Sequence, residues 1–133
     1  MSNPSGVPDE VIAFVSAHIR SVEQLEILLL VRESAPRAWS VHEANAVIRS
    51  SEESVAAKLR TLAELGLLSR RAPGEDVFAF APRDAELAAC VDRVAETYRD
   101  RRTSIIELIY SQPEQTLKSF SDAFLVRKDK KNG

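Results

Sequence analysis

The feature that most constrains this sequence is a helical pattern that ends at a glycine and is followed by two short segments typical of strands. Over residues 50–65, apolar side chains recur at three- and four-residue steps, which is typical of an amphipathic helix. Gly66 then stands where helices commonly end in a left-handed residue. Because the turn-forming residues 72–76 separate the runs 67–71 and 77–81, the sequence predicts a β-hairpin directly after the helix.

Two helices are predicted near the start of the chain. The first covers residues 9–20, with Asp9 as its expected N-terminal cap and apolar side chains on one face. The second begins at Ser21 and ends before Pro36. It is apolar on several sides, so we expect it to lie buried at the centre of the fold. The short stretch that ends at Trp39 is interpreted as a small strand.

Pairs of serine and glutamate mark the starts of the next two helices. Ser40 with Glu43, and Ser50 with Glu53, match the capping box, in which each side chain accepts a hydrogen bond from the backbone of the other residue. A helix is therefore predicted after each serine, with a tight turn between the two helices.

From Asp84 to Ser111 the pattern is that of one long helix, about 42 Å in length at roughly 1.5 Å per residue. The preceding 62 residues form a unit with a radius of gyration of about 11 Å, so the helix is expected to overhang it and to pair with a second copy of the chain. The alternative is a monomer in which the helix bends within the polar run 99–104 and folds back onto its own chain. The predicted dimer interface consists of Leu87, Val91, Val94, Tyr98, Ile105 and Leu108.

The chain is accordingly divided into four parts. Residues 1–20 are an N-terminal tail and helix, 21–82 the central domain, 83–126 a C-terminal helical dimerisation segment, and 127–133 a disordered tail. A final short helix is expected over residues 113–124, and its apolar side chains are expected to join the dimer interface.

Between residues 21 and 82 the predicted order is helix, short link, helix, tight turn, helix and β-hairpin. This order resembles the winged helix-turn-helix, in particular its MarR-like form in bacterial transcription regulators. The resemblance is closest where Leu62 to Leu68 read Leu-Ala-Glu-Leu-Gly-Leu-Leu, since in that family the recognition helix ends in Leu-x-x-Leu-Gly-Leu-Leu and a wing follows. It implies a mainly α fold with a small β-hairpin, a winged helix-turn-helix with flanking N- and C-terminal helices. It also implies a homodimeric DNA-binding transcription regulator.

The helix after Ser50 divides into an inner and an outer face. The inner face carries apolar side chains that are expected to pack on the earlier helices, namely Val55, Leu59, Leu62 and Leu65. The resemblance implies that the outer face enters the major groove of double-stranded DNA, where small and polar side chains read bases while arginines and serine caps contact the backbone. The implied DNA-contacting residues are Ser40, Ser51, Ser54, Ala57, Lys58, Arg60, Thr61, Arg70 and Arg71.

The charge balance favours a different partner. The whole chain has 18 Lys and Arg against 20 Asp and Glu, and residues 21–82 carry seven basic and nine acidic side chains. Glu52 and Glu53 stand at the helix start that would face phosphates, where acids also suit the helix dipole. Arg70 and Arg71 are equally explained as solubilising a hairpin edge, and capping alone explains the serines. The alternative function is therefore a winged-helix protein–protein interaction module that does not bind DNA and that modulates another regulator or signalling protein.

The sequence carries no pattern for catalysis, a metal or a cofactor. The two histidines lack a metal-ligand spacing, and the single cysteine, Cys90, is interpreted as a packing residue, with a redox-sensing thiol as the sharper alternative. The start of the chain lacks the features of a signal peptide, and the longest apolar run, residues 27–31, is far short of a membrane span. We therefore expect a cytoplasmic protein that is not an enzyme and has no membrane partner.

Overall fold

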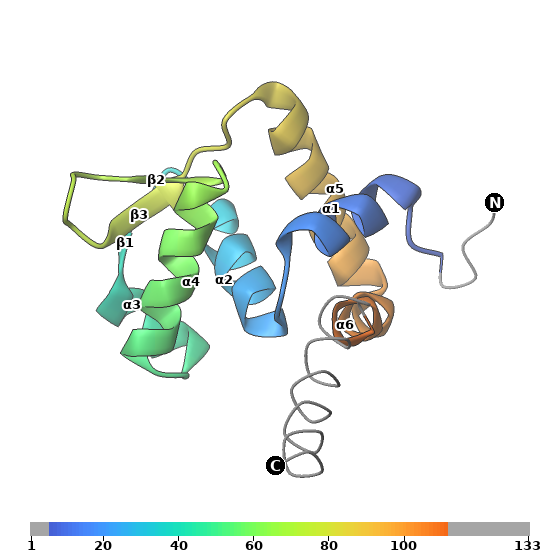
Figure 1. Ribbon diagram of the computed structural model, residues 1–133, viewed down its shortest axis with the longest axis horizontal. Helices are drawn as coiled ribbons and strands as arrows, with labels where there is room; N and C mark the ends of the chain where they lie inside the picture. The colour runs from blue at the N-terminus through green and yellow to red at the C-terminus, as the bar shows by residue number, and fades with distance from the viewer. Residues whose placement is uncertain (1–5, 112–133) are drawn as a thin grey trace, which may run out of the picture.

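The computed structural model describes residues 6–111, which form six helices and three short strands (Figure 1). In chain order these are α1 (Asp9–His18), α2 (Val22–Glu33), β1 (Trp39–Ser40), α3 (Val41–Ile48), α4 (Glu52–Glu64), β2 (Leu68–Arg70), β3 (Val77–Phe80), α5 (Ala85–Asp100) and α6 (Arg102–Tyr110). The fold is mainly α with a small antiparallel sheet, as the sequence predicts, and it is compatible with a winged helix. The helix and tail predicted for residues 113–124 and 127–133 lie outside the described residues.

The strands form one antiparallel sheet in the order β1-β3-β2. β2 and β3 are the predicted hairpin, with Leu68 opposite Phe80, while β1 pairs Trp39 with Phe78. Trp39 and Phe78 are both buried, and the indole N–H of Trp39 donates a 2.7 Å hydrogen bond to Ser34 Oγ. The small strand predicted at Trp39 is thus confirmed, and it joins the hairpin to the segment that follows α2.

Two predicted helix starts have different outcomes. Ser40 and Glu43 form the expected capping box of α3, with Ser40 N donating to Glu43 Oε1 at 3.0 Å and Glu43 N donating to Ser40 Oγ at 3.1 Å. Asp9 is not the cap of α1, because the helix starts one residue earlier than a cap at Asp9 requires. Pro8 occupies the cap position and Asp9 is the first helical residue, where its charge suits the helix dipole.

The turn between α3 and α4 corrects a third helix start. Ser51, not Ser50, caps α4 by accepting a 3.1 Å hydrogen bond from Ser54 N. Arg49 adopts a left-handed backbone (φ 64°) at the end of α3, and Ser50 N then donates a 2.9 Å hydrogen bond to Asn45 Oδ1. Ser50 is therefore part of the turn, and the helix begins one residue later than the sequence predicts.

Helix α4 packs its inner face against α2 and the sheet. Val55, Leu59 and Leu62 are fully buried, and Leu65 is partly buried against the same core. These side chains hold α4 so that its opposite face points outward beside the hairpin (Figure 1). The predicted division of this helix into an inner and an outer face is confirmed.

Gly66 ends α4 as the sequence predicts. Its backbone is left-handed (φ +83°), which favours glycine. Leu67 N donates to Leu62 O at 3.0 Å and Gly66 N donates to Ala63 O at 3.0 Å, the pair of hydrogen bonds that defines a Schellman cap. The chain thereby reverses from α4 directly into β2.

The C-terminal part of the described chain is not one long helix. Helix α5 ends at Asp100, Arg101 leaves the helical region (φ −134°, ψ 51°), and α6 then begins at Arg102. Both helices pack against α1 (Figure 1). The single overhanging helix is thus a wrong prediction, and the bend within residues 99–104 is what the structure contains. The polar residues 99–104 interrupt the apolar face of α5. Apolar side chains return in α6, which packs back against α1.

The residues predicted for a dimer interface lie inside one copy of the chain. Val91, Val94 and Ile105 are fully buried, and Tyr98 retains 7% of its exposure. Leu87 and Leu108 are partly buried and pack on the same core. The four buried side chains are therefore not available to a second copy, which corrects their assignment to an interface. The core also runs without interruption across the predicted domain boundaries at residues 20 and 82.

Polar contacts on the surface join α5 and α6 to α2. Tyr98 Oη donates a 2.9 Å hydrogen bond to Glu26 Oε2, and Arg102 donates to the same oxygen at 2.9 Å. Burial, together with this hydrogen bond, raises the pKa of Tyr98 to about 12. Further along α2, Arg32 pairs with Asp92 at 2.9 Å. The helices that flank the central unit are therefore held to it by both apolar and charged contacts.

Candidate binding surface of helix α4 and the wing

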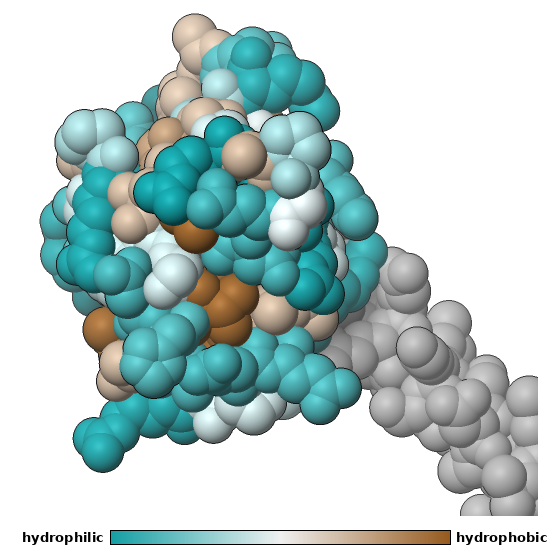
Figure 2. Space-filling view, turned by 90° about the vertical axis from the view of Figure 1, so that its left-hand side faces the viewer, coloured by the Kyte–Doolittle hydropathy of each residue, from teal (hydrophilic) through white to brown (hydrophobic). Residues whose placement is uncertain are grey.

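Most of the residues predicted to contact DNA come together on α4 and on the wing, by which we mean β2, β3 and the connecting turn 71–76. Ala57 and Thr61 are exposed on the outer face of α4, as expected for residues that contact a partner. The side of the molecule that carries α3 and the wing is mostly hydrophilic, with a hydrophobic patch near its middle (Figure 2). Polar and charged side chains therefore make up most of this surface.

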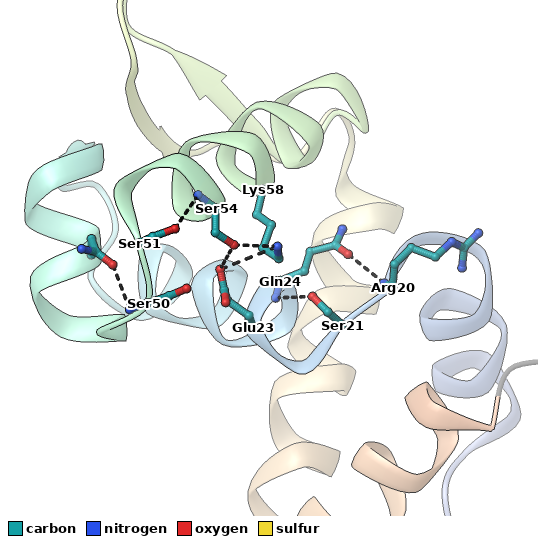
Figure 3. Close-up of polar contacts among 9 residues, drawn as sticks. Arg20, Ser21, Glu23, Gln24, Ser50, Ser51, Ser54 and Lys58 are labelled. Carbon is teal, nitrogen blue, oxygen red and sulfur yellow. Dashed lines mark hydrogen bonds and ion pairs between the residues drawn. The ribbon is translucent and has the colours of Figure 1, made fainter. Parts of the chain in front are cut away.

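Two of the residues predicted to read bases are bound to α2 instead (Figure 3). Ser54 Oγ donates a 2.7 Å hydrogen bond to Glu23 Oε2, and Lys58 Nζ donates a 3.0 Å hydrogen bond to Ser54 Oγ. Lys58 Nζ also lies 3.7 Å from Glu23 Oε2. The half-buried side chains of Ser54 and Lys58 thus point toward α2 and not outward from α4.

The environment of Glu23 keeps this cluster charged. Burial alone would raise the pKa of Glu23, but hydrogen bonds from Ser54 and Ser50 and the charge of Lys58 outweigh it and hold the pKa below its usual value. Glu23 is therefore ionised at neutral pH and neutralises Lys58. Sequence reasoning missed Glu23 because it lies 31 positions before Ser54 on another helix.

Two of the arginines predicted to contact DNA, Arg60 and Arg70, share one carboxylate, that of Asp76. Arg60 of α4 forms a bidentate pair with Asp76, with Nε 3.1 Å from Oδ1 and Nη2 2.5 Å from Oδ2. Arg70 of β2 donates from Nη2 to Asp76 Oδ1, and its Nε donates to Glu75 O at 2.9 Å. The hydrogen bonds from Arg60 and Arg70 hold the pKa of Asp76 well below its usual range. The wing turn thus carries its own counterion for both guanidinium groups.

Arg71 is paired in the same way. Its Nη2 lies 2.8 Å from Glu75 Oε2 and its Nε lies 3.2 Å from Glu75 Oε1. With Lys58 held by Glu23, all four cations predicted for the DNA interface contact a carboxylate of their own chain. Glu75 and Asp76 were read from the sequence only as turn residues. Glu75 pairs within the turn, whereas Asp76 also reaches Arg60 on α4.

The two serines predicted to contact the DNA backbone are helix caps. Ser40 Oγ accepts from Glu43 N and Ser51 Oγ accepts from Ser54 N, each at 3.1 Å. Capping accounts for both positions, as the alternative interpretation of the sequence held. Neither serine contacts the arginines described above.

Acidic side chains surround the start of α4. Glu52 and Glu53 are exposed in its first turn, and His42 Nδ1 of α3 lies 2.8 Å from Glu52 Oε2. The hydrogen bond and charge of Glu52 raise the pKa of His42 above its ordinary value. Residues 39–80 carry five Lys or Arg and six Asp or Glu, so this surface has no excess of positive charge.

A groove of about 720 Å³ lies elsewhere on the protein, lined by α2, α3, α5 and α6. Leu29, Leu30 and Val47 contribute apolar surface to it, and the Val47 side chain is 53% exposed. Charged side chains such as Arg99 and Glu96 border this apolar surface. The groove offers an apolar contact surface distinct from α4 and the wing.

The structure also bears on the residues considered for metal and redox chemistry. Within residues 6–111, no group of three or more His, Cys, Asp or Glu side chains is arranged to hold a metal ion. Cys90 is partly buried, and burial together with the nearby acids Glu10 and Glu86 raises the pKa of its thiol. A raised pKa keeps the thiol protonated, which favours the packing interpretation over a reactive thiolate.

Two comparisons complete the description. Across residues 6–111, no helix combines the length and hydropathy that crossing a membrane requires. Comparison of the chain with models of known protein families and with curated protein sequences gives no match.

Proposed function

We propose that this protein is a winged-helix protein–protein interaction module that modulates another regulator or signalling protein. The observation that carries the proposal is the pairing of Lys58, Arg60, Arg70 and Arg71 with carboxylates of the same chain. These are the side chains on which DNA binding by this surface would depend.

The physics of DNA binding explains why this pairing matters. Affinity for DNA comes largely from cations that replace the counterions condensed on phosphates. A guanidinium that already shares a carboxylate gains little by exchanging it for a phosphate, and the displaced carboxylate would then face the DNA backbone. Glu52 and Glu53 place two carboxylates in the first turn of α4, of which Glu52 contacts His42. A protein partner with basic side chains fits this surface better, since complementary charges select partners and speed association.

The proposal is tested by charge reversal on the purified full-length chain and its partner. A protein that co-purifies with the chain is produced separately and mixed with it again. The affinity of the reconstituted complex is then measured by calorimetry. We expect Glu52→Lys together with Glu53→Lys to weaken the complex at least about tenfold, which corresponds to about 1.4 kcal/mol. Glu107→Lys, an exposed single charge reversal on α6, is the control and should leave affinity unchanged. Equal affinity for all three proteins would contradict a role for the α4 surface.

The second candidate is a cytoplasmic, MarR-like, homodimeric DNA-binding transcription regulator of the bacterial type. The observation in its favour is the exposed outer face of α4, where Ala57 and Thr61 stand beside the wing. A homodimer of this kind needs contacts other than the buried Val91, Val94 and Ile105. Selection of genomic fragments by the purified chain tests DNA binding. A mass measurement in solution tests whether the chain forms a homodimer. Enrichment of one palindromic sequence by a dimer would favour this candidate over the protein module.

A further inference from the structure

Arg60, Arg70 and Asp76 form a compact arrangement between α4 and the wing. Two guanidinium groups from different elements converge on a single carboxylate, and Arg60 binds it through two parallel N–H donors. A backbone contact orients Arg70, whose Nε donates to Glu75 O at 2.9 Å. The guanidinium of Arg70 also lies 5.5 Å from the centre of the Phe78 ring. The two arginines are thus positioned by the fold as well as by Asp76.

The position of Asp76 is open to exchange. The Arg60 side chain is 51% exposed, that of Arg70 38% and that of Asp76 27%. A hollow of about 220 Å³ lies beside them, lined by Arg60, Arg70, Ala63, Glu64 and Phe78. A ligand can therefore reach both guanidinium groups from solvent. Asp76 belongs to a turn, so it can leave without disturbing the core.

We propose that Arg60 and Arg70 form an oxyanion-binding site for a carboxylate side chain of a protein partner, and that Asp76 occupies this site in the unbound protein. The partner's identity as a protein rests on the proposed function, whereas the oxyanion site itself rests on the geometry. Planar guanidinium forks bind a carboxylate bidentately, and the site already holds one in this way. Glu64 lines the same hollow, and its negative charge opposes a ligand with several phosphates more strongly than a single carboxylate.

Exchange of one carboxylate for another leaves the charge of the site unchanged. Asp76 is tethered a few residues from Arg70, so it competes at an effective concentration on the order of millimolar. A single carboxylate in solution therefore binds the wild-type protein poorly, while a partner that makes further contacts can displace Asp76. Removing the charge of Asp76 should leave both arginines open to a small carboxylate.

The test follows the Nε–H NMR signals of Arg60 and Arg70 in the full-length chain during titration with sodium acetate, at ionic strength held constant with sodium chloride. We expect the Arg60 and Arg70 signals of Asp76→Asn to shift at acetate concentrations that leave those of the wild type unchanged. Glu53→Gln removes the same charge from the first turn of α4 and should respond as the wild type does. Adding Arg60→Ala to Asp76→Asn should abolish the response. Asp76→Ser is a second variant that also removes the carboxylate, in case the asparagine disturbs the turn.

The outcomes separate the site from its ligand. The same weak response in the wild type, Asp76→Asn, Asp76→Ser and Glu53→Gln would overturn the proposed site. A short DNA duplex is titrated in parallel, and duplex binding by Asp76→Asn without acetate binding would overturn the assignment to a carboxylate. Failure of the protein-module function would instead appear as specific DNA binding by the wild-type chain, which the acetate titration does not measure.

Discussion

Ser54 on α4 donates a 2.7 Å hydrogen bond to Glu23 on α2, and this contact turns a predicted base-reading side chain into a structural one. Lys58 completes the cluster from one helical turn further along α4. The start of α4 is therefore fixed to the central helix by charged and polar contacts in addition to its buried apolar face.

We expect Glu23→Gln to lower the free energy of unfolding by about 1 kcal/mol at pH 7, because it weakens the hydrogen bond from Ser54 and removes the counterion of Lys58. Glu33→Gln, an exposed change on the same helix, is the control. The pKa of Glu23 is lower in the folded protein than its ordinary value of 4.5, so its contribution is present above that pH and is lost as the pH falls through the folded value. Urea unfolding between pH 3 and pH 7 checks this prediction, and identical pH profiles for the wild type and Glu23→Gln would contradict it.

Gly66→Ala should destabilise the protein by about 1–2 kcal/mol, since alanine is strained at a positive φ. Its Cβ would also lie 3.0 Å from the Arg83 side chain, which must then move. Gly74→Ala shares the positive φ but meets nothing within 4 Å, so its cost should be smaller. Thermal and urea unfolding of the two variants measures the difference. A Gly66→Ala protein as stable as the wild type would rule out the left-handed cap.

Ile105→Ala should lower the free energy of unfolding by about 2–5 kcal/mol, because Ile105 is fully buried inside one copy of the chain. Ile106→Ala, at a partly buried neighbouring position, should cost less. The unfolding midpoint should not depend on protein concentration, which distinguishes a core residue from an interface residue. If Ile105→Ala instead produced a stable monomer from a dimeric wild type, the bend between α5 and α6 would be wrong.

The two histidines should titrate on opposite sides of the ordinary histidine pKa of 6.5. The hydrogen bond and charge of Glu52 raise the pKa of His42, whereas burial and the positive charges of Arg20 and Arg83 lower that of His18. The His42–Glu52 contact therefore favours folding at low pH and is lost as the pH rises through the raised pKa of His42. NMR titration of the imidazole signals measures both values, and Glu52→Gln should lower only that of His42. The reverse order of the two pKa values would refute these environments.

The parts of the fold that could be predicted from sequence are those set by local chemistry. Gly66 marked the end of α4 because few other residues accept a left-handed backbone, and the turn residues 72–76 marked the hairpin. The apolar period of α4 identified the buried Leu59 and Leu62. In each case, neighbouring residues in the sequence determine the structure.

The parts that sequence reasoning missed depend on distant contacts. The polar run 99–104 offered a bend as the alternative to one long helix, and the packing of α1 against both α5 and α6 decides for the bend at Arg101. Likewise, Arg60 lies 16 positions before Asp76, and no local pattern indicates that the hairpin brings them together. The carboxylate partners of Arg70 and Arg71 lie only six and four positions away, so these two pairs were within reach of the predicted hairpin.

The most direct test of the central claim is the binding of fluorescent DNA duplexes to the wild-type chain, measured by anisotropy from low to physiological salt. Because Glu23, Glu75 and Asp76 pair with Lys58, Arg60, Arg70 and Arg71, binding should be weak and non-saturating, with little dependence on salt. Saturable binding at low salt, with a steep decline in affinity as salt increases, would show that these cations bind phosphates and would contradict the account.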